Sequence, residues 1–239
     1  MLTWVTIQND FFCGSLFYLA FISICCTMYF LTKELYFPPV ETASTEGVLA
    51  VGGDLSVERL LLAYRSGIFP WFDPDEPILW WAPPERMVVV PETYKIPKSI
   101  RNILNKNTFR VSRNTNFKSV ILHCQNIPRK GQQGTWITDD IVNSYTQLHE
   151  MGHAHSFEVW QNNQLVGGLY GVDLGHVFCG ESMFSLVSNA SKVAFVALIL
   201  YLKTHHYQLL DCQVHNEHLE LLGAFEIDRT DFMQVLNSK

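Results

Sequence analysis

Residues 177–185 read Val177-Phe178-Cys179-Gly180-Glu181-Ser182-Met183-Phe184-Ser185, and residues 210–214 read Leu210-Asp211-Cys212-Gln213-Val214. Each stretch predicts a buried strand that carries a few polar side chains, and burying an unpaired polar group costs about 1–3 kcal/mol. Side chains alternate along a strand, so Asp211 and Gln213 should share one face, opposite their apolar neighbours. A carboxylate beside an amide at a strand end indicates either a functional site or a satisfied hydrogen-bonded pair in the core.

Strands and helices alternate on both sides of these two stretches. Apolar periodicity and turn residues predict strands at residues 156–160, 164–172, 176–182, 208–214 and 224–227. The same signals predict helices at residues 99–105, 116–125 and 138–151, from residue 189 or 191 to 205, and at residues 217–222. A strand meander followed by helix, strand, helix and strand predicts an α+β fold.

Residues 33–84 differ from the rest of the chain because they are rich in Gly, Pro and Trp. They predict a small N-terminal α/β module with one short helix, which Ser56 caps and Gly67 ends. A strand at residues 87–90 should close this module. Residues 85–239 should form the larger domain.

An apolar run precedes the module, because residues 11–32 contain no charged residue and no histidine. About 20 apolar residues suffice to span a bilayer, so this extension (residues 1–32) is long enough to hold an anchor. Lys33 would then place the body of the protein on the cytoplasmic side. We favour a second interpretation, in which translation begins at Met28 and residues 1–27 are absent from the mature protein.

Charge is unevenly distributed along the chain. The 239 residues have a net charge of −6, which argues against a generally basic nucleic-acid binder. Residues 86–130 nevertheless contain one acidic residue, Glu92, and ten basic residues: Arg86, Lys95, Lys98, Arg101, Lys106, Arg110, Arg113, Lys118, Arg129 and Lys130. Such segregation indicates either a phosphate-binding surface or an ordinary solvated basic face.

Patterns that bind metals are weak in this sequence. The six cysteines show no C-x-x-C spacing, so neither a zinc knuckle nor a disulfide framework is indicated. The run His149-Glu150-Met151-Gly152-His153 matches the H-E-x-x-H pattern of zinc peptidases, which needs both histidines on one face of a continuing helix. Gly152 predicts that the helix ends within the motif, so a zinc hydrolase remains only an alternative.

Several stretches, taken in order, resemble the leucyl/phenylalanyl-tRNA–protein transferase family over residues 37–237. Besides residues 149–156, 178–185 and 211–214, the resemblance rests on four landmarks. They are Gly47-Val48-Leu49-Ala50-Val51-Gly52-Gly53-Asp54-Leu55-Ser56, Gly67-Ile68-Phe69-Pro70-Trp71-Phe72, Ile78-Leu79-Trp80-Trp81-Ala82-Pro83 and Gly134-Thr135-Trp136-Ile137-Thr138.

The resemblance implies an activity, a fold and partners. The enzyme would move Leu, Phe or Met from leucyl-, phenylalanyl- or methionyl-tRNA to the α-amine of proteins that begin with Arg or Lys, which creates a degradation signal. Its C-terminal domain would have an acetyltransferase-like (GNAT-type) fold with a mixed, mostly antiparallel sheet. We expect a cytoplasmic monomer that uses no cofactor and no metal.

The resemblance also implies roles for individual residues. Asp211 and Gln213 match the catalytic pair, in which the carboxylate orients and polarises the amide. Glu181 would bind the donor's α-amino group or the terminal nucleoside. The apolar donor pocket would use Phe178, Met183 and Leu210, and the terminal adenine would stack on Trp71 and Trp136. The tRNA backbone would contact Lys98, Arg101, Lys106, Arg110, Arg113, Lys118, Arg129 and Lys130.

Two further alternatives come from the fold and the charge pattern. An acyl-CoA-dependent N-acyltransferase would share the fold, but residues 188–192 lack the Q/R-x-x-G-x-G/A loop that cradles pyrophosphate in that class. Fold similarity alone does not identify the acyl donor. A non-enzymatic RNA-binding module would bind tRNA without releasing a deacylated product.

Overall fold

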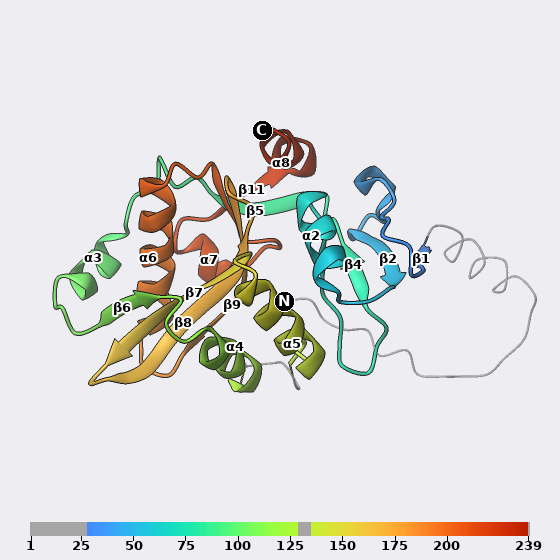
Figure 1. The fold of residues 1–239 in the computed structure, drawn as a ribbon. Coiled ribbons are helices and arrows are strands. Elements are labelled where there is room, and N and C mark those ends of the chain that lie inside the picture. The colour runs from blue at the N-terminus through green and yellow to red at the C-terminus, as the bar shows by residue number, and fades with distance from the viewer. Residues whose placement is uncertain (1–27, 129–134, 239) are drawn as a thin grey trace, which may run out of the picture.

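The computed structural model describes residues 28–128 and 135–238, whose strands form two sheets (Figure 1). The larger sheet has the order β11-β5-β10-β9-β8-β7-β6. Its strands are β5 (Glu85–Val89), β6 (Arg110–Arg113), β7 (Ala154–Gln161), β8 (Gln164–Asp173), β9 (Val177–Ser185), β10 (Leu209–Asp211) and β11 (Phe225–Asp228). Within this sheet β9 and β10 pair in parallel and the other neighbours are antiparallel. The predicted α+β fold with a mixed, mostly antiparallel sheet is confirmed.

Helices cover both faces of the larger sheet because it is apolar on both sides. One core contains residues of α4 (Phe117–Asn126), α5 (Asp139–Glu150) and α8 (Arg229–Leu236). The other contains residues of α3 (Lys98–Leu104) and α6 (Ala190–Thr204), with Leu219 of α7 (Glu217–Glu220) packed against it. The helices expected at residues 99–105, 116–125 and 138–151 are therefore present, shifted by one or two residues, whereas β6 and α8 were not predicted.

The smaller sheet has the order β1-β2-β4-β3. Its strands are β1 (Tyr29–Leu31), β2 (Val48–Gly52), β3 (Phe69–Pro70) and β4 (Leu79–Trp81), which accompany the 3-10 turn η1 (Val40–Thr42) and α2 (Val57–Arg65). As predicted, the Ser56 side chain caps α2 by accepting a hydrogen bond from the Arg59 N–H. One expectation was wrong: the strand that should close this module, β5, pairs with β10 and β11 in the larger sheet.

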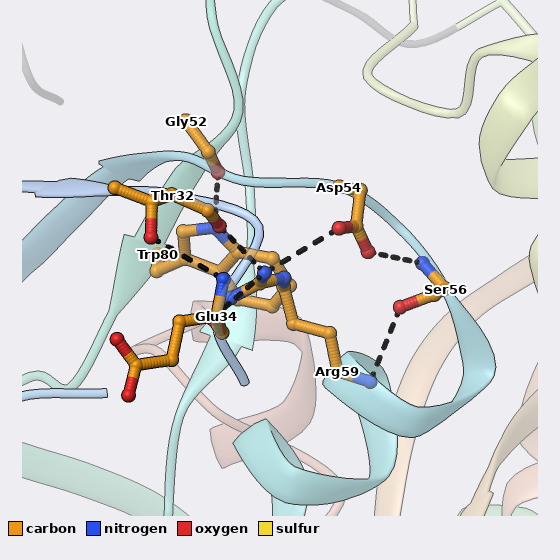
Figure 2. Close-up of polar contacts among 7 residues, drawn as sticks. All are labelled: Thr32, Glu34, Gly52, Asp54, Ser56, Arg59 and Trp80. Carbon is orange, nitrogen blue, oxygen red and sulfur yellow. Dashed lines mark hydrogen bonds and ion pairs between the residues drawn. The ribbon is translucent and has the colours of Figure 1, made fainter. Parts of the chain in front are cut away.

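Arg59 on α2 is fully buried and binds the beginning of the described chain (Figure 2). Its Nη2 donates to the carbonyls of Thr32 and Glu34, at 2.8 and 3.1 Å, and lies 3.4 Å from Asp54 Oδ2. Its Nε and Nη1 have no hydrogen-bond partner within the described residues. This arginine therefore holds the segment that follows β1 against α2.

The apolar run at residues 11–32 falls mostly on residues 1–27, which lie outside the described part of the chain. Its last residues include β1, at the edge of the smaller sheet. Across residues 28–128 and 135–238, no helix combines the length and the apolar composition that crossing a membrane requires. The choice between an anchor and a start at Met28 therefore stays a prediction.

Candidate active site

A cavity of about 790 Å³ opens beside the middle of β9 and the end of β10, and most of the residues expected at the site line it. Its volume lies within the range of about 300–1,000 Å³ that is typical of small-molecule sites. Six of the predicted residues line it, namely Trp71, Trp136, Glu181, Met183, Leu210 and Gln213. The two sheets thus both contribute to one site, since Trp71 follows β3 of the smaller sheet whereas Glu181, Met183 and Leu210 lie on strands of the larger sheet.

A β-bulge on β9 aims Glu181 toward the helices. Tyr170 of β8 pairs with Ser182 and Gly171 pairs with Gly180, so Glu181 is the extra residue between them. A bulge redirects a side chain and changes the alternation beyond it. Gly171 allows this close approach, because a Cβ at that position would lie 2.2 Å from the carbonyl oxygen of Cys179.

The Glu181 carboxylate accepts hydrogen bonds from three side chains. Tyr64 of α2 donates to Oε1 at 2.7 Å, and Gln213 Nε2 donates to the same oxygen at 2.9 Å. The hydroxyl of Tyr145 on α5 lies 3.3 Å from Oε2 and also hydrogen-bonds to the Tyr64 hydroxyl, so its single proton serves one of these two contacts at a time. Residues from four separate segments therefore meet at one carboxylate.

The environment of Glu181 shifts its proton affinity. Burial, opposed by the hydrogen bond from Tyr64 and aided by the nearby Asp211 charge, raises the pKa of the Glu181 carboxyl to about 7. Burial and the Glu181 charge raise the pKa of Tyr64 and of Tyr145 well above the usual value for tyrosine. The tyrosines therefore remain neutral donors, whereas Glu181 titrates near neutrality.

Asp211 ends β10 and is fully buried beside Arg86. Arg86 donates from Nε to Oδ1 at 2.9 Å and from Nη2 to Oδ2 at 2.8 Å, a bidentate ion pair. Oδ1 also accepts the backbone N–H of Gln213 at 2.8 Å. Among the described residues, the Asp211 carboxylate makes no hydrogen bond to the Gln213 side chain, so it contacts Gln213 through the main chain.

The expected alternation of Asp211 and Gln213 along one strand was wrong. The predicted strand at residues 208–214 ends at Asp211, and Gln213 has a left-handed backbone with φ of 67°. The Gln213 side chain still reaches the cavity, because this turn redirects it toward Glu181. Asp211 and Gln213 therefore belong to the same site because of this turn, and not because their side chains alternate along a strand.

The donor-pocket residues divide into two groups. Met183 and Leu210 line the cavity, together with the apolar residues Leu169, Phe195, Leu198 and Leu219. Phe178 does not line it and is buried in the core that α6 covers, so its expected place in the pocket is not supported by its position. Phe178 and Met183 are five residues apart, so they would point to opposite faces of a regular strand. The bulge at Glu181 shifts the alternation by one residue, and both side chains therefore pack in the same core.

Both predicted tryptophans border the cavity but differ in exposure. Trp71 is 39% exposed and its ring lies 5.6 Å from that of Trp81, whose Nε1 donates to the Trp71 carbonyl. Trp136 is buried, at 7% exposure. An exposed ring beside a cavity offers a face for stacking, so Trp71 is better placed for that role than Trp136.

The basic residues expected to contact tRNA are mostly on the surface. Lys98, Arg101, Lys106, Arg110 and Lys118 are exposed on α3, the loop after it, β6 and α4. Arg113 is half-buried, with its guanidinium carbon 4.4 Å from the centroid of the Tyr201 ring. Arg129 and Lys130 lie outside the described residues. Arg86 belongs to the same basic stretch of the sequence but was not among the residues expected to contact tRNA, and it is buried at the site.

The H-E-x-x-H stretch does not have the geometry of a zinc site. Helix α5 ends at Glu150, and Gly152 has φ of 83°, so His153 leaves the helix face as predicted. His149 Nδ1 bonds the carbonyl of Ala154 at 2.8 Å, and its ring stacks on Phe117. Within the described residues, no group of three or more His, Cys, Asp or Glu side chains is placed to hold a metal ion.

Three residues at the site were missed by the sequence analysis: Tyr64, Tyr145 and Arg86. Both tyrosines lie on apolar helix faces, where a buried hydroxyl requires a hydrogen-bond partner. Arg86 lies in the buried part of β5, next to the apolar residues 87–89, where a buried charge requires a partner of opposite sign. These requirements predict that partners exist but do not identify them.

Comparison with known proteins places the chain in a family. The leucyl/phenylalanyl-tRNA protein transferase model matches residues 88–237, and the model of that family's N-terminal domain matches residues 53–84. A leucyl/phenylalanyl-tRNA–protein transferase of Flavobacterium johnsoniae is 64% identical over 212 residues, covering 89% of this chain and 100% of the relative. The one of Flavobacterium psychrophilum is 57% identical over 209 residues, covering 87% and 99%.

The protein is therefore an aminoacyltransferase. It belongs to the leucyl/phenylalanyl-tRNA–protein transferase family, which uses aminoacyl-tRNA and protein substrates. Among solved structures, FemX matches with a TM-score of 0.46 and 11% identity, over 72% of this chain and 66% of that chain. This structural likeness is too weak to support a statement about function.

Proposed function

We propose that this enzyme transfers Leu, Phe or Met from charged tRNA to the α-amine of cytoplasmic proteins that begin with Arg or Lys, creating a degradation signal. The observation that carries the proposal is one cavity in which a half-buried carboxylate, an amide and an apolar wall converge. An aminoacyl ester needs this combination, because its side chain is apolar while its amino and carbonyl groups are polar.

The apolar part of the cavity suits a donor side chain that is not branched at Cβ, as in Leu, Phe and Met. Met183 and Leu210 line the cavity together with Gly180 and Glu181. Glu181 is then placed to accept a hydrogen bond from the donor's α-amino group. Selection by shape is modest, since one methylene changes binding by only about 1–3 kcal/mol.

Gln213 is proposed to accept a hydrogen bond from the attacking amine. Its Nε2 is held by Glu181, and within the described residues its Oε1 has no hydrogen-bond partner, so that oxygen is the atom left for substrate. The carboxylate of Glu181 needs a donor, which fixes the orientation of the amide.

The reaction is an ester aminolysis. The amine nitrogen forms a bond to the acyl carbon, the bond from that carbon to the ribose oxygen breaks, and the ribose oxygen takes up the proton that the amine loses. An α-amine has an ordinary pKa of about 7.7–8.0, so part of it is already neutral near pH 7. The enzyme therefore acts chiefly by positioning, which can be worth roughly 7–11 kcal/mol.

The exposed lysines and arginines of α3, β6 and α4 are proposed to bind the tRNA backbone. Counterion release makes such binding steeply dependent on salt. Substituting Lys98, Arg101 or Lys106 by Gln should weaken tRNA binding and reduce its salt dependence, whereas Lys33→Gln, outside this stretch, should leave both unchanged.

The decisive assay incubates the full chain with Leu-tRNA and a peptide that begins with Arg, and follows the peptide mass. The proposal predicts a gain of one Leu at the peptide's N-terminus. Matched controls are a peptide beginning with Ala and a mixture of uncharged tRNA with free Leu, neither of which should react. Transfer that ignores the first residue, or no transfer while tRNA still binds, would refute the proposed acceptor or the proposed reaction.

A further inference from the structure

Arg86 is a buried cation at the site to which the proposed reaction assigns no chemical step. It lies on β5, is 2% exposed, and is sandwiched between the rings of Phe69 and Phe232 at 4.8 and 4.5 Å. Burying a charge is costly unless it is fully compensated. Its retention beside the cavity therefore calls for a specific interaction.

Each nitrogen of the Arg86 guanidinium group has an acceptor. Nε and Nη2 bind the two oxygens of Asp211, and Nη1 donates to the carbonyl of Gly67 at 3.0 Å. Gly67 follows α2, three residues before Pro70 and four before Trp71, which both line the cavity. Arg86 thus connects two segments, the one that runs from Gly67 to Trp71 and the end of β10 at Asp211. Residues of both segments line the cavity.

The backbone of Gln213 is held on both sides by neighbours of this guanidinium. Its N–H donates to Asp211 Oδ1 at 2.8 Å, and its carbonyl accepts from the N–H of Met87, the next residue after Arg86, at 3.1 Å. The backbone of Gln213 has φ of 67°, a value that is uncommon for a residue other than glycine. A strained conformation of this kind persists only where its surroundings fix it.

We propose that Arg86 is a positioning residue for aminoacyl transfer: it orients the Asp211 carboxylate, which then fixes the main chain of Gln213 so that its amide faces Glu181 and the cavity. Asp211 on this account acts through a backbone N–H and not as a base. The inference rests on the proposed role of Gln213 in the reaction.

Only an arginine satisfies this geometry. Its planar fork binds both carboxylate oxygens and the Gly67 carbonyl together, whereas the ammonium of a lysine is a single point charge. A misplacement of about 1 Å at a reacting group can lower the rate about 10²-fold. Loss of the fork should therefore lower turnover more than it weakens substrate binding.

The test compares Arg86→Gln and Arg86→Lys with the matched variants Arg59→Gln and Arg59→Lys in the full chain. Arg59 is also a fully buried arginine, but it contacts neither the cavity nor Asp211. We measure kcat and KM for Leu-tRNA with an Arg-initiated peptide, normalised to folded protein by circular dichroism. Arg86→Gln should lower kcat about 10²-fold and Arg86→Lys about 10-fold, with KM changed far less. Both Arg59 variants should keep the wild-type kcat.

Three results would overturn the positioning role: wild-type kcat in the Arg86 variants, a change confined to KM, or an equal loss of kcat in the Arg59 variants. If the Arg86 variants do not fold, kcat of Asp211→Asn and Asp211→Ala, normalised to folded protein, tests the carboxylate through which Arg86 is proposed to act. Asn keeps an oxygen that can accept the Gln213 N–H, so it should retain more kcat than Ala; equal kcat in the two contradicts the proposal. A wild-type chain that transfers no Leu would instead count against the proposed function.

Discussion

Arg59 and Arg86 are both buried, yet they are used differently. Arg86 binds a carboxylate that is itself fully buried, and each of its nitrogens has an acceptor. Arg59 uses Nη2 alone, its acidic partner Asp54 is 50% exposed, and its other contacts are backbone carbonyls. The comparison teaches that the buried charge of Arg86 fixes the geometry of residues at the cavity, whereas the buried charge of Arg59, on α2, holds a segment of the chain in place.

The largest expected effect comes from removing each arginine's acidic partner. Asp211→Asn leaves the buried Arg86 charge uncompensated and should lower the free energy of unfolding by about 3–5 kcal/mol. Asp54→Asn should lower it by less than about 1 kcal/mol, because Asp54 is half exposed and its pair is screened by solvent. Urea unfolding followed by circular dichroism measures both. Equal losses would mean that the two ion pairs are equivalent after all.

The second prediction concerns pH, and it separates the cavity from the smaller sheet. Burial raises the pKa of Glu181 from 4.5 to about 7. Between these values the folded state holds a proton that the unfolded state has released, so stability should fall as pH rises from 4.5 to about 7. Glu181→Gln should flatten this slope, and the exposed Glu76→Gln should not. An unchanged slope in Glu181→Gln would show that another group is responsible.

A third, smaller effect is expected at Arg59. Arg59→Met removes the hydrogen bonds to the Thr32 and Glu34 carbonyls but also removes two buried N–H groups that have no partner in the described residues. A hydrogen bond to a charged group contributes about 1.5–3 kcal/mol. Because the two effects oppose each other, the free energy of unfolding should fall by no more than this amount. Thermal unfolding measures the loss, and kcat of the folded protein should be unchanged. A fall in kcat would remove the distinction between the two arginines.

The smallest effect is expected at the cap of α2. Ser56→Ala removes the acceptor for the Arg59 N–H and should cost about 1 kcal/mol. Ser66→Ala, at the other end of the same helix, is the matched control, because within the described residues Ser66 makes no side-chain hydrogen bond. Chemical denaturation of the two variants measures the difference in stability. Equal unfolding midpoints would show that the Ser56 side chain does not stabilise α2 as a cap.

Much of the larger sheet and its helices could be predicted because their signals are local. The meander of β7, β8 and β9 follows from runs of apolar residues separated by Asn162-Asn163 and Gly175, where the backbone adopts positive φ. Helix α5 follows from its apolar face and its Thr138 cap. The smaller sheet was harder, because β3 and β4 are short strands in a segment rich in Gly, Pro and Trp, and their pairing is not a local property.

The candidate site shows where prediction from sequence stops. Glu181, Gln213 and Trp71 were identified through the family resemblance, and the structure brings them to one cavity. Their mutual geometry depends on a one-residue bulge and on a left-handed turn, neither of which periodicity indicates. Arg86 could be recognised as a charge in a buried strand, but its partner lies 125 residues away in the sequence.

The most direct test of the account is the single-turnover rate of Leu transfer from bound Leu-tRNA to an Arg-initiated peptide by Gln213→Ala, with the exposed Gln208→Ala as control. Removing one preorganised hydrogen-bonding group at a reacting centre typically costs about 10²–10³ in rate. The account predicts a loss of this size for Gln213→Ala and none for Gln208→Ala. A Gln213→Ala enzyme that transfers Leu at the wild-type rate would contradict the proposed site.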